Sequence, residues 1–447
     1  MSRNTIRGDS AATIAASVER ALQAGTLGER DRLPAIRDLA ASLRVSPVTV
    51  AAAYRLLHSR GLAVGRGRQG TRLRAASVVA APVGRMKKLD AGLVDLATGN
   101  PDPTLLPPLN DALRIVSMDH GLYGGPPELP ALVAFAAGEF EADGISPGPV
   151  AVTSGALDAV ERVLREHVRT GDRVVVEDPT FPALLDLLAS LGLTPVPCAL
   201  DDDGPRPDAL ERALGPGVRA IVITPRAQNP TGAAISARRA SDLTRALRRR
   251  PDALLIQLDD VSAVSGAPLV TLTHGRSQWA AVRSTSKFLG PDIRVAVMTG
   301  DAVTIARVQR RQAVSDRWVS HLLQKLALAL WSDPSCGRRL ARAATIYAER
   351  RNGLIEALTA RGVAASGRSG LNVWIPVREE TATVQALADC GWVVAAGERF
   401  RIESPPAIRV TTSAMGPAEA HQFAADVAAT VLPGSTARAP GRRAGAG

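Results

Sequence analysis

Apolar and polar residues alternate with a helical period over most of the first sixty residues. Apolar side chains recur three and four positions apart between residues 10 and 23, which predicts an amphipathic helix. The same period predicts helices over residues 35–43 and 47–60, the latter beginning at Pro47 with Ser46 as its N-cap. Two short helices joined by so tight a turn predict a helix-turn-helix, whose second helix can enter the major groove of DNA.

The following residues, 61–73, predict a small β-hairpin. Two short apolar segments flank a basic, glycine-containing turn, as in the wing of a winged helix. Arg66 and Arg68 lie in that turn, where their side chains can contact phosphates or the minor groove.

Most of the net positive charge lies in the same part of the chain. Residues 1–74 contain thirteen arginines and five acidic residues, so they hold eight of the eleven net positive charges. This distribution indicates a polyanionic partner. An arginine-rich genome would give a similar balance, so the alternative is an arginine-rich helical cap that does not bind DNA.

This segment resembles the winged helix of GntR-type bacterial regulators. The resemblance is carried by Leu33-Pro34, Arg37, Leu39-Ala40, Leu43, Val45-Ser46, Thr49-Val50, Ala53-Tyr54, Leu56-Leu57, Gly61-Leu62 and Gly70-Thr71. It implies that double-stranded operator DNA is the partner and that Arg37, Ser46, Thr49 and the two wing arginines face it. Ala35 and Pro47 stand where the family often has a hydroxyl and an arginine. Fewer backbone contacts and a different operator sequence are therefore expected.

Beyond residue 92 the pattern changes to short apolar runs that alternate with helical segments. Six runs read as strands: 150–153, 173–177, 220–224, 253–259, 279–283 and 296–299. Short apolar strands alternating with helices predict an α/β unit with a mostly parallel sheet covered on both faces. Ligands of such sheets bind at the carboxyl ends of the strands.

The composition between and after these units predicts less ordered segments. Small residues with one Pro and a few Gly predict a linker over residues 76–92. A tail rich in Gly, Ala, Pro and Arg predicts disorder over residues 433–447. The predicted domains are therefore a winged helix at 1–75 and an α/β unit at 93–432.

Lys287 is the first candidate for chemistry. It is one of only four lysines in a chain of 447 residues that otherwise uses arginine for positive charge. Unlike arginine, a lysine amine can lose its proton and attack a carbonyl. The hydroxyls of Ser284 and Ser286 precede it, and Arg294 follows seven positions later, a set that suits a phosphate. Together they predict pyridoxal 5'-phosphate held as a Schiff base on Lys287. A surface lysine on a loop is the alternative.

Other predicted strand ends carry residues that suit the rest of this cofactor. Ser154, Gly155 and Ala156 open a helix whose free amides suit a phosphate, although any capped helix looks similar. Phe181 follows a strand in a chain with only 3% aromatic residues, so it is a candidate to stack on the ring, with core packing as the alternative.

The remaining candidates are polar. The Asn229 amide can donate to the phenolate oxygen of the ring, and the buried carboxylate of Asp259 needs a cation, for which the pyridinium nitrogen is suitable. Arg409, beside a later strand, has a planar fork that suits a carboxylate, and a surface arginine is the alternative.

Over about residues 95–430 these elements occur in the order that resembles fold-type I aminotransferases. The resemblance implies a mostly parallel sheet followed by a smaller carboxyl-terminal α+β subdomain. It implies that Lys287, Asn229, Asp259 and Phe181 hold the ring and that Ser154, Gly155, Ala156, Ser284, Ser286 and Arg294 hold the phosphate. It also implies a homodimer in which Tyr123 reaches the phosphate of the neighbouring subunit and Arg409 binds an effector or substrate carboxylate.

A GntR-type winged helix joined to an aminotransferase-like domain resembles the MocR class of regulators. The segments 318–324 and 397–400 look most like its PtsJ-type branch. Two departures weigh against transamination: Val261 stands where the family usually has a tyrosine or histidine, and Asp158 stands where glutamine is frequent. We expect at most weak or partial transamination.

Three functional hypotheses follow. In the first, the protein is a DNA-binding regulator that senses pyridoxal phosphate or a small amino compound through its large domain. In the second it is an active aminotransferase with an appended DNA-binding domain. In the third the large domain has lost the cofactor and is only a dimerisation scaffold. We expect a cytoplasmic, nucleoid-associated protein with no membrane segment, and three scattered cysteines predict neither disulfides nor a metal site.

Overall fold

The computed structural model describes residues 6–24, 26–28, 31–59, 62–65, 70–73, 92–117 and 122–432. Arg66, Arg68, the predicted linker apart from Gly92, and the predicted tail lie outside the described residues. The chain forms two compact units, a small amino-terminal one and a large one.

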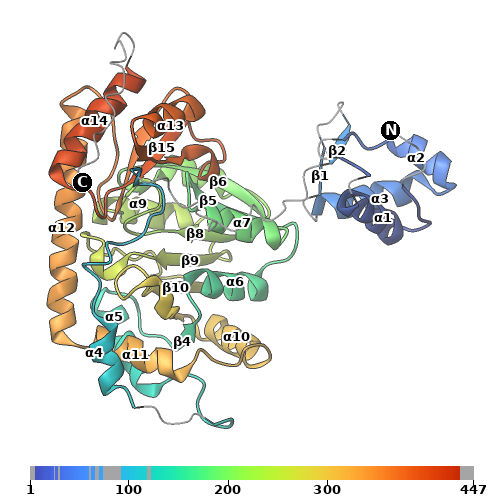
Figure 1. The fold of residues 1–447 in the computed structure, drawn as a ribbon. Coiled ribbons are helices and arrows are strands. Elements are labelled where there is room, and N and C mark those ends of the chain that lie inside the picture. Colours follow the sequence, from blue (N-terminus) through green and yellow to red (C-terminus); the bar gives the residue numbers. More distant parts are fainter. Residues whose placement is uncertain are drawn as a thin grey trace. The chain divides into compact units, whose positions relative to one another are not determined.

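The small unit is a winged helix (Figure 1). It consists of α1 (Ala11–Gln23), α2 (Ile36–Leu43), α3 (Pro47–Ser59) and the antiparallel strands β1 (Ala63–Gly65) and β2 (Thr71–Leu73). The side chains of Ser10 and Ser46 cap α1 and α3, each accepting a backbone N–H three residues later.

A small apolar core holds these elements together. Ile14 and Val18 of α1 are fully buried with Val50 and Leu57 of α3. The buried Tyr54 hydroxyl donates to the Pro34 carbonyl oxygen at 2.8 Å, which ties α3 to the segment before α2. The predicted helix-turn-helix and wing are confirmed.

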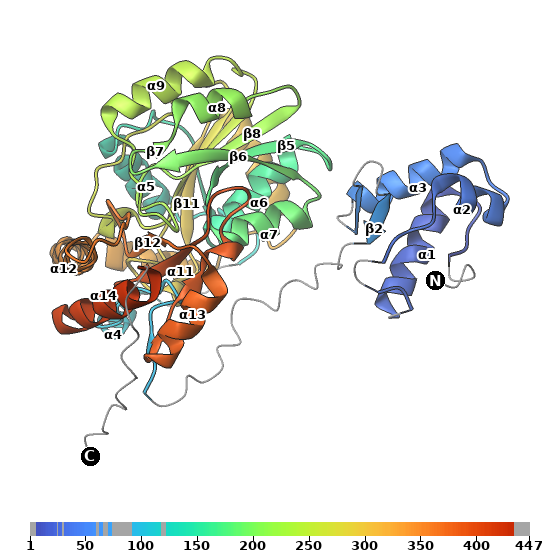
Figure 2. The same ribbon diagram turned by 90° about the horizontal axis from the view of Figure 1, so that it is seen from above.

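The large unit is built on an eight-stranded sheet with helices on both faces (Figures 1 and 2). In sheet order the strands are β4 (Val150–Thr153), β11 (Ala296–Gly300), β10 (Trp279–Ser284), β9 (Leu254–Asp259), β8 (Val218–Ile223), β5 (Arg173–Asp178), β6 (Thr194–Asp201) and β7 (Gly204–Pro205). β11 is antiparallel to both of its neighbours, whereas β10, β9, β8 and β5 are parallel. The predicted mostly parallel α/β sheet is confirmed.

The helices of this unit fall between and around the strands. They are α4 (Leu109–Ile115), α5 (Pro130–Ala142), α6 (Ala156–His167), α7 (Pro182–Ser190), α8 (Pro207–Ala213), α9 (Ala237–Leu247), α10 (Ala302–Ala313), α11 (His321–Trp331) and the long α12 (Pro334–Thr359). Their apolar faces and the buried strands form one continuous core.

A carboxyl-terminal subdomain follows α12. Its three-stranded sheet has the order β12 (Asn372–Pro376), β15 (Ala407–Thr411), β14 (Ala395–Ala396), and it is covered by α13 (Glu380–Asp389) and α14 (Pro417–Val431). A separate strand pair joins β13 (Trp392–Val393) to β3 (Val94–Asp95), so the start of the large unit packs against its end.

The described residues offer neither a membrane-spanning helix nor a metal-binding cluster. No described helix is both long and apolar enough to cross a bilayer. No cluster of three or more His, Cys, Asp or Glu among these residues could hold a metal ion.

Candidate functional site

The parallel strands bring the predicted residues to one edge of the large sheet. Lys287, Asp259 and Asn229 each lie at or shortly after the carboxyl end of β10, β9 or β8. The predicted phosphate residues that follow β4 lie at the same edge. Ala296 of β11 pairs with Ser284 at the end of β10 and with Thr153 at the end of β4.

Gly99 lies between Lys287 and Arg409 and contacts both. The Nζ of Lys287 donates to the Gly99 carbonyl oxygen at 2.9 Å, and Lys287 forms no ion pair with any described residue. A Cβ at Gly99 would lie 3.3 Å from Nη1 of Arg409, and Gly99 has φ +69°. This close approach favours glycine there. Our sequence interpretation missed Gly99, although its place in a Thr-Gly-Asn-Pro turn was a signal for a loop.

Arg409 is a buried cation that forms no ion pair with a carboxylate of the described residues. It lies in β15 with 5% exposure, and its guanidinium donates to the Ala97 carbonyl oxygen and to Oδ1 of Asn229 at 3.2 Å. Its Cζ lies 4.9 Å from the centre of the Phe400 ring, and its buried Nε has no hydrogen-bond partner. Burial lowers the pKa of Arg409 to about 10. Such a group is suited to an incoming carboxylate.

The predicted phosphate residues also lie together. Nη2 of Arg294 donates to the Ser154 carbonyl oxygen at 2.9 Å, and a Cβ at Gly155 would lie only 2.7 Å from the same nitrogen. α6 begins at Ala156 with no side-chain cap, so its first amides are available to an anion. At the end of β10, which β11 separates from β4, the Ser284 and Ser286 hydroxyls are 2.8 Å apart.

Asp158 does not add an uncompensated charge to this helix end. One carboxylate oxygen accepts the Ser154 N–H at 2.9 Å, and the other accepts from Nε of Arg162 at 2.8 Å. Arg162 in turn pairs with Asp316. The ion pair with Arg162 offsets the negative charge of Asp158, which the sequence interpretation counted against transamination.

Asp259 has partners that the sequence interpretation did not foresee. Its Oδ1 accepts from Nε of Arg226 at 3.0 Å and from the Ser262 N–H at 3.2 Å. Its Oδ2 accepts from Nη2 of Arg226 at 2.9 Å and from Nε of Arg283 at 3.1 Å. Burial alone would raise the pKa of Asp259, but the two guanidinium groups lower it below its ordinary value. The carboxylate therefore has cationic partners within the protein.

Phe181, Val261 and Tyr123 differ in how far they are buried. Phe181 is half-buried immediately before α7, and Val261 is buried in the main core. Tyr123 is 78% exposed and packs edge-to-face against Trp318, with the Arg317 guanidinium over its ring. Tyr123 is thus a surface residue of this chain.

The end of β5 carries two acidic residues that our interpretation left without a role. Asp178 accepts the backbone N–H groups of Ile402, Glu403 and Ser404, which ties β5 to the carboxyl-terminal subdomain. Glu177 is fully buried and accepts from Nε2 of Gln228, the residue before Asn229. Burial raises the pKa of Glu177 to about 7.

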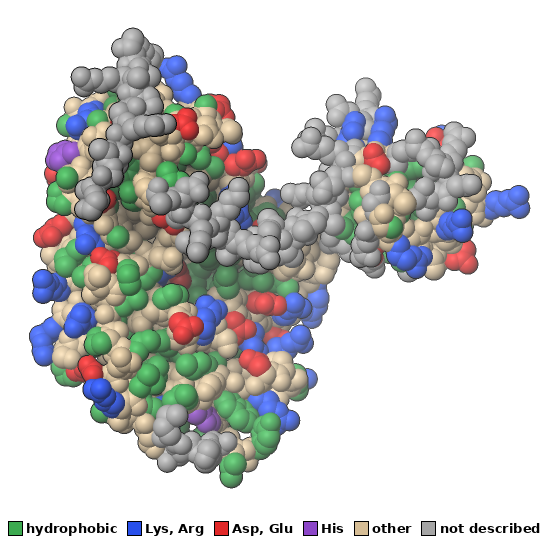
Figure 3. Space-filling view, viewed as in Figure 1, with side chains coloured by type: hydrophobic (Ala, Val, Ile, Leu, Met, Phe, Trp, Pro, Cys, Tyr) green, Lys and Arg blue, Asp and Glu red, His purple; other side chains and the backbone are tan. Residues whose placement is uncertain are grey.

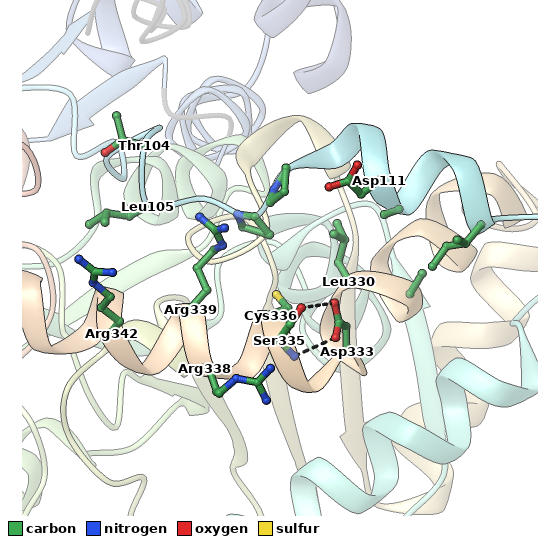
Figure 4. Close-up of a pocket in the computed structure, with 15 residues that line it drawn as sticks. Thr104, Leu105, Asp111, Leu330, Asp333, Ser335, Cys336, Arg338, Arg339 and Arg342 are labelled. Atoms are coloured by element: carbon green, nitrogen blue, oxygen red, sulfur yellow. Dashed lines mark hydrogen bonds between the residues drawn. The ribbon is translucent and has the colours of Figure 1, made fainter.

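One cavity of about 720 Å³ lies away from these residues, between α4, α11 and α12 (Figure 4). Figure 4 shows Arg339 and Arg342 directed from α12 toward the segment of Thr104 and Leu105. No predicted cofactor residue lines this cavity.

In the small unit, the predicted DNA contacts lie at the start of α3 and on α2. Arg37 and Ser46 are exposed, and Thr49 is half-buried, with its hydroxyl 2.8 Å from that of Ser46. Arg44 forms the turn between the helices with φ +55°. Val48, which our interpretation did not single out, is 72% exposed in the first turn of α3.

Comparison with known proteins agrees with both units. The family "Bacterial regulatory proteins, gntR family" matches residues 10–73, and "Aminotransferase class I and II" matches residues 125–427. The vitamin B6 salvage pathway transcriptional repressor PtsJ of Salmonella typhimurium is 40% identical over 430 residues, which cover 94% of this chain and 98% of PtsJ.

The chain belongs to the family of transcriptional regulators that includes PtsJ, with a GntR-type amino-terminal unit and an aminotransferase class I and II unit. The resemblance to MocR-type regulators, and to their PtsJ-like branch, is confirmed. A more distant relative is the uncharacterized HTH-type transcriptional regulator YdcR of Escherichia coli, 28% identical over 82% of this chain and 86% of YdcR.

Solved structures share the fold of the large unit. Pyrococcus horikoshii kynurenine aminotransferase matches with a TM-score of 0.70 at 21% identity, over 76% of this chain and 91% of that chain. An aminotransferase from Mycobacterium tuberculosis matches with a TM-score of 0.66 at 19% identity, over 77% and 92%. The predicted fold-type I fold is confirmed.

Proposed function

We propose that this regulator binds pyridoxal 5'-phosphate covalently through Lys287 and uses the occupancy of that site to change its binding to operator DNA. The observation that carries the proposal is the set of groups around Lys287. A half-buried amine without an ion-pair partner lies close to a buried arginine that lacks a carboxylate. Amine and guanidinium are the groups that an aldehyde and a carboxylate require.

The phosphate residues fit the same cofactor. The uncapped start of α6, the paired hydroxyls of Ser284 and Ser286, and Arg294 provide amide, hydroxyl and guanidinium donors. Gly155 is part of this fit, because a Cβ there would collide with the Arg294 guanidinium. When bound, pyridoxal phosphate supplies an aldehyde that reacts reversibly with amines. The chain's own residues then orient it: Asn229 beside the ring oxygen and Phe181 against its face.

The effector is the cofactor itself or a small amino compound. Arg409 is placed to select compounds that carry a carboxylate, since its guanidinium forms no ion pair with any described residue and feels only the more distant charge of Asp95. The salvage-pathway name of the relative PtsJ supports the cofactor as the effector.

A homodimer is part of the proposal. Figure 3 shows apolar side chains on the lower part of the large unit, around α4 and α11. Large apolar side chains that are exposed in this unit include Ile115 at 74%, Leu122 at 78% and Val314 at 78% exposure, close in sequence to Tyr123 or to Trp318, against which Tyr123 packs. Exposed apolar surface of this kind marks an interface. A second copy would cover it and bring Tyr123 to the partner's phosphate site.

Operator DNA is contacted by Arg37, Ser46 and Thr49, with Arg66 and Arg68 in the wing. The exposed start of α3 supports this placement, because the first turn of a recognition helix lies against base edges. A regulator of this kind acts in the cytoplasm, at the nucleoid. An active aminotransferase remains the second candidate, favoured by the donors grouped for a phosphate around Arg294 and by the buried Arg409.

Trapping with borohydride tests the cofactor site. The full chain is incubated with pyridoxal phosphate, reduced, digested and mapped. The chain has only four lysines, Lys87, Lys88, Lys287 and Lys325, so the labelled peptide identifies the site directly. We expect the label on Lys287 and loss of the label in Lys287→Ala, with Lys325→Ala as the matched control. A label distributed over the other three lysines would contradict the proposal.

A further inference from the structure

The structure contains a buried ionic cluster around Asp259, the predicted partner of the ring nitrogen. We call the four residues Asp143, Arg226, Asp259 and Arg283 the charge quartet. Arg226 and Arg283 each pair with both aspartates, and the side chains of Arg226, Asp259 and Arg283 are at most 8% exposed. Two positive and two negative groups make the quartet electrically balanced.

The quartet also uses the whole hydrogen-bonding capacity of Asp259. A carboxylate offers about four acceptor positions. Arg226 fills two of them, Arg283 one and the Ser262 N–H the fourth. A further donor must therefore displace one of these groups.

Both arginines also donate to backbone carbonyl oxygens outside the quartet. Nη1 of Arg226 donates to the Ala267 carbonyl oxygen at 3.2 Å, and Nη1 of Arg283 donates to the Glu139 carbonyl oxygen at 3.3 Å. The Cζ of Arg283 also lies 5.0 Å from the centre of the Phe140 ring. These contacts oppose any withdrawal of the guanidinium groups from Asp259.

We infer that Arg226 and Arg283 occupy Asp259 so fully that the ring nitrogen of bound pyridoxal phosphate stays unprotonated. This inference rests on the proposed function. It gives a physical reason why the site would bind an amine reversibly instead of converting it. A protonated ring nitrogen would add a third positive charge to a balanced buried cluster, which the low dielectric of the interior opposes. An unprotonated pyridine withdraws electrons weakly, so amines still reach the aldehyde while loss of the amine's α-proton is slow.

The expected effect of releasing Asp259 can be stated as a fold-change. An opposite charge nearby shifts a pKa by about one to three units. Freeing two acceptor positions of Asp259 should therefore raise the protonated fraction of the ring nitrogen about tenfold or more, as long as that fraction is small.

The test is 15N NMR of the full chain loaded with pyridoxal phosphate labelled at the ring nitrogen. The wild type should give the resonance of an unprotonated pyridine. Arg226→Gln should move it toward the pyridinium position. Arg226→Lys, which keeps the charge but loses the bidentate fork, guards against misfolding and should move it in the same direction to a smaller extent.

Asp143→Asn is the matched control. It removes the quartet's more exposed carboxylate, so both arginines remain on Asp259. The 15N resonance should therefore stay at the position of an unprotonated pyridine. A pyridinium resonance in the wild type, or identical resonances in all four proteins, would overturn the inference while leaving the proposed function intact. Failure of the wild type to bind the cofactor at all would refute the proposed function and this inference with it.

Discussion

The clearest quantitative prediction concerns Arg409. Arg409 is 5% exposed and forms no ion pair with a described carboxylate, and burial lowers its pKa to about 10. The ordinary value is about 12.5, and one pKa unit corresponds to about 1.36 kcal/mol. Keeping this charge buried therefore costs about 3 kcal/mol, which an incoming carboxylate can offset.

That energy corresponds to about a hundredfold in affinity, at about 1.4 kcal/mol for each factor of ten. The wild type should thus bind an amino acid about a hundredfold more tightly than the amine that lacks the carboxylate. Arg409→Gln removes the charge but can still hydrogen-bond to Ala97 or Asn229, so it should abolish this preference without loss of the fold.

The assay compares L-alanine with ethylamine in both proteins loaded with pyridoxal phosphate, following the change in visible absorbance as each amine binds. Arg401→Gln is the matched control, because Arg401 pairs with Glu380 in the same subdomain. Equal affinity for the two ligands in the wild type, or an unchanged preference in Arg409→Gln, would refute the reasoning.

Two further predictions concern the small unit and the pH dependence of stability. Arg37→Ala should weaken operator binding and lower the slope of log affinity against log salt by about one, whereas Arg20→Ala, an equally exposed arginine of α1, should leave the slope unchanged in the same gel-shift titration. The pKa of Glu177 is raised by burial to about 7 in the folded state, so the folded protein binds the extra proton and its stability should fall as pH rises from about 4.5 to 7. Glu177→Gln should remove about 3 kcal/mol of that fall, measured by urea unfolding at pH 5 and pH 8, and parallel curves for the two proteins would contradict the assignment.

The sequence predicted the elements of the small unit and six of the eight strands of the large sheet, but not β6 or β7. The helical period and the N-cap Ser46 placed α1 and α3 correctly, β4 begins and ends at the predicted residues, and α6 begins at Ala156 as predicted. The structure also places Lys287, Asn229 and Arg409 near one another, as the order of motifs implied. In these regions local periodicity and capping decide the structure.

The pattern of apolar and polar residues along the chain could not predict contacts between residues far apart in sequence. Arg226 and Arg283 looked like ordinary arginines in a chain that uses arginine throughout, and only the register of β9 and β10 brings Arg283 beside Asp259. The Asp158–Arg162 pair was a different kind of omission, because its spacing of four residues in one helix was a local signal that our interpretation did not use. The small carboxyl-terminal sheet depends on pairing between residues about thirty-five positions apart, for which no local signal exists.

The most direct test of the account is operator binding by the full chain, with and without pyridoxal phosphate, in the wild type and in Lys287→Ala. Promoter fragments selected by the purified protein supply the DNA. The account predicts that the cofactor changes the affinity of the wild type, and that Lys287→Ala binds the same fragments with an affinity that no longer responds. An unresponsive wild type, or a Lys287→Ala variant that responds equally, would contradict the claim that Lys287 links the cofactor to DNA binding.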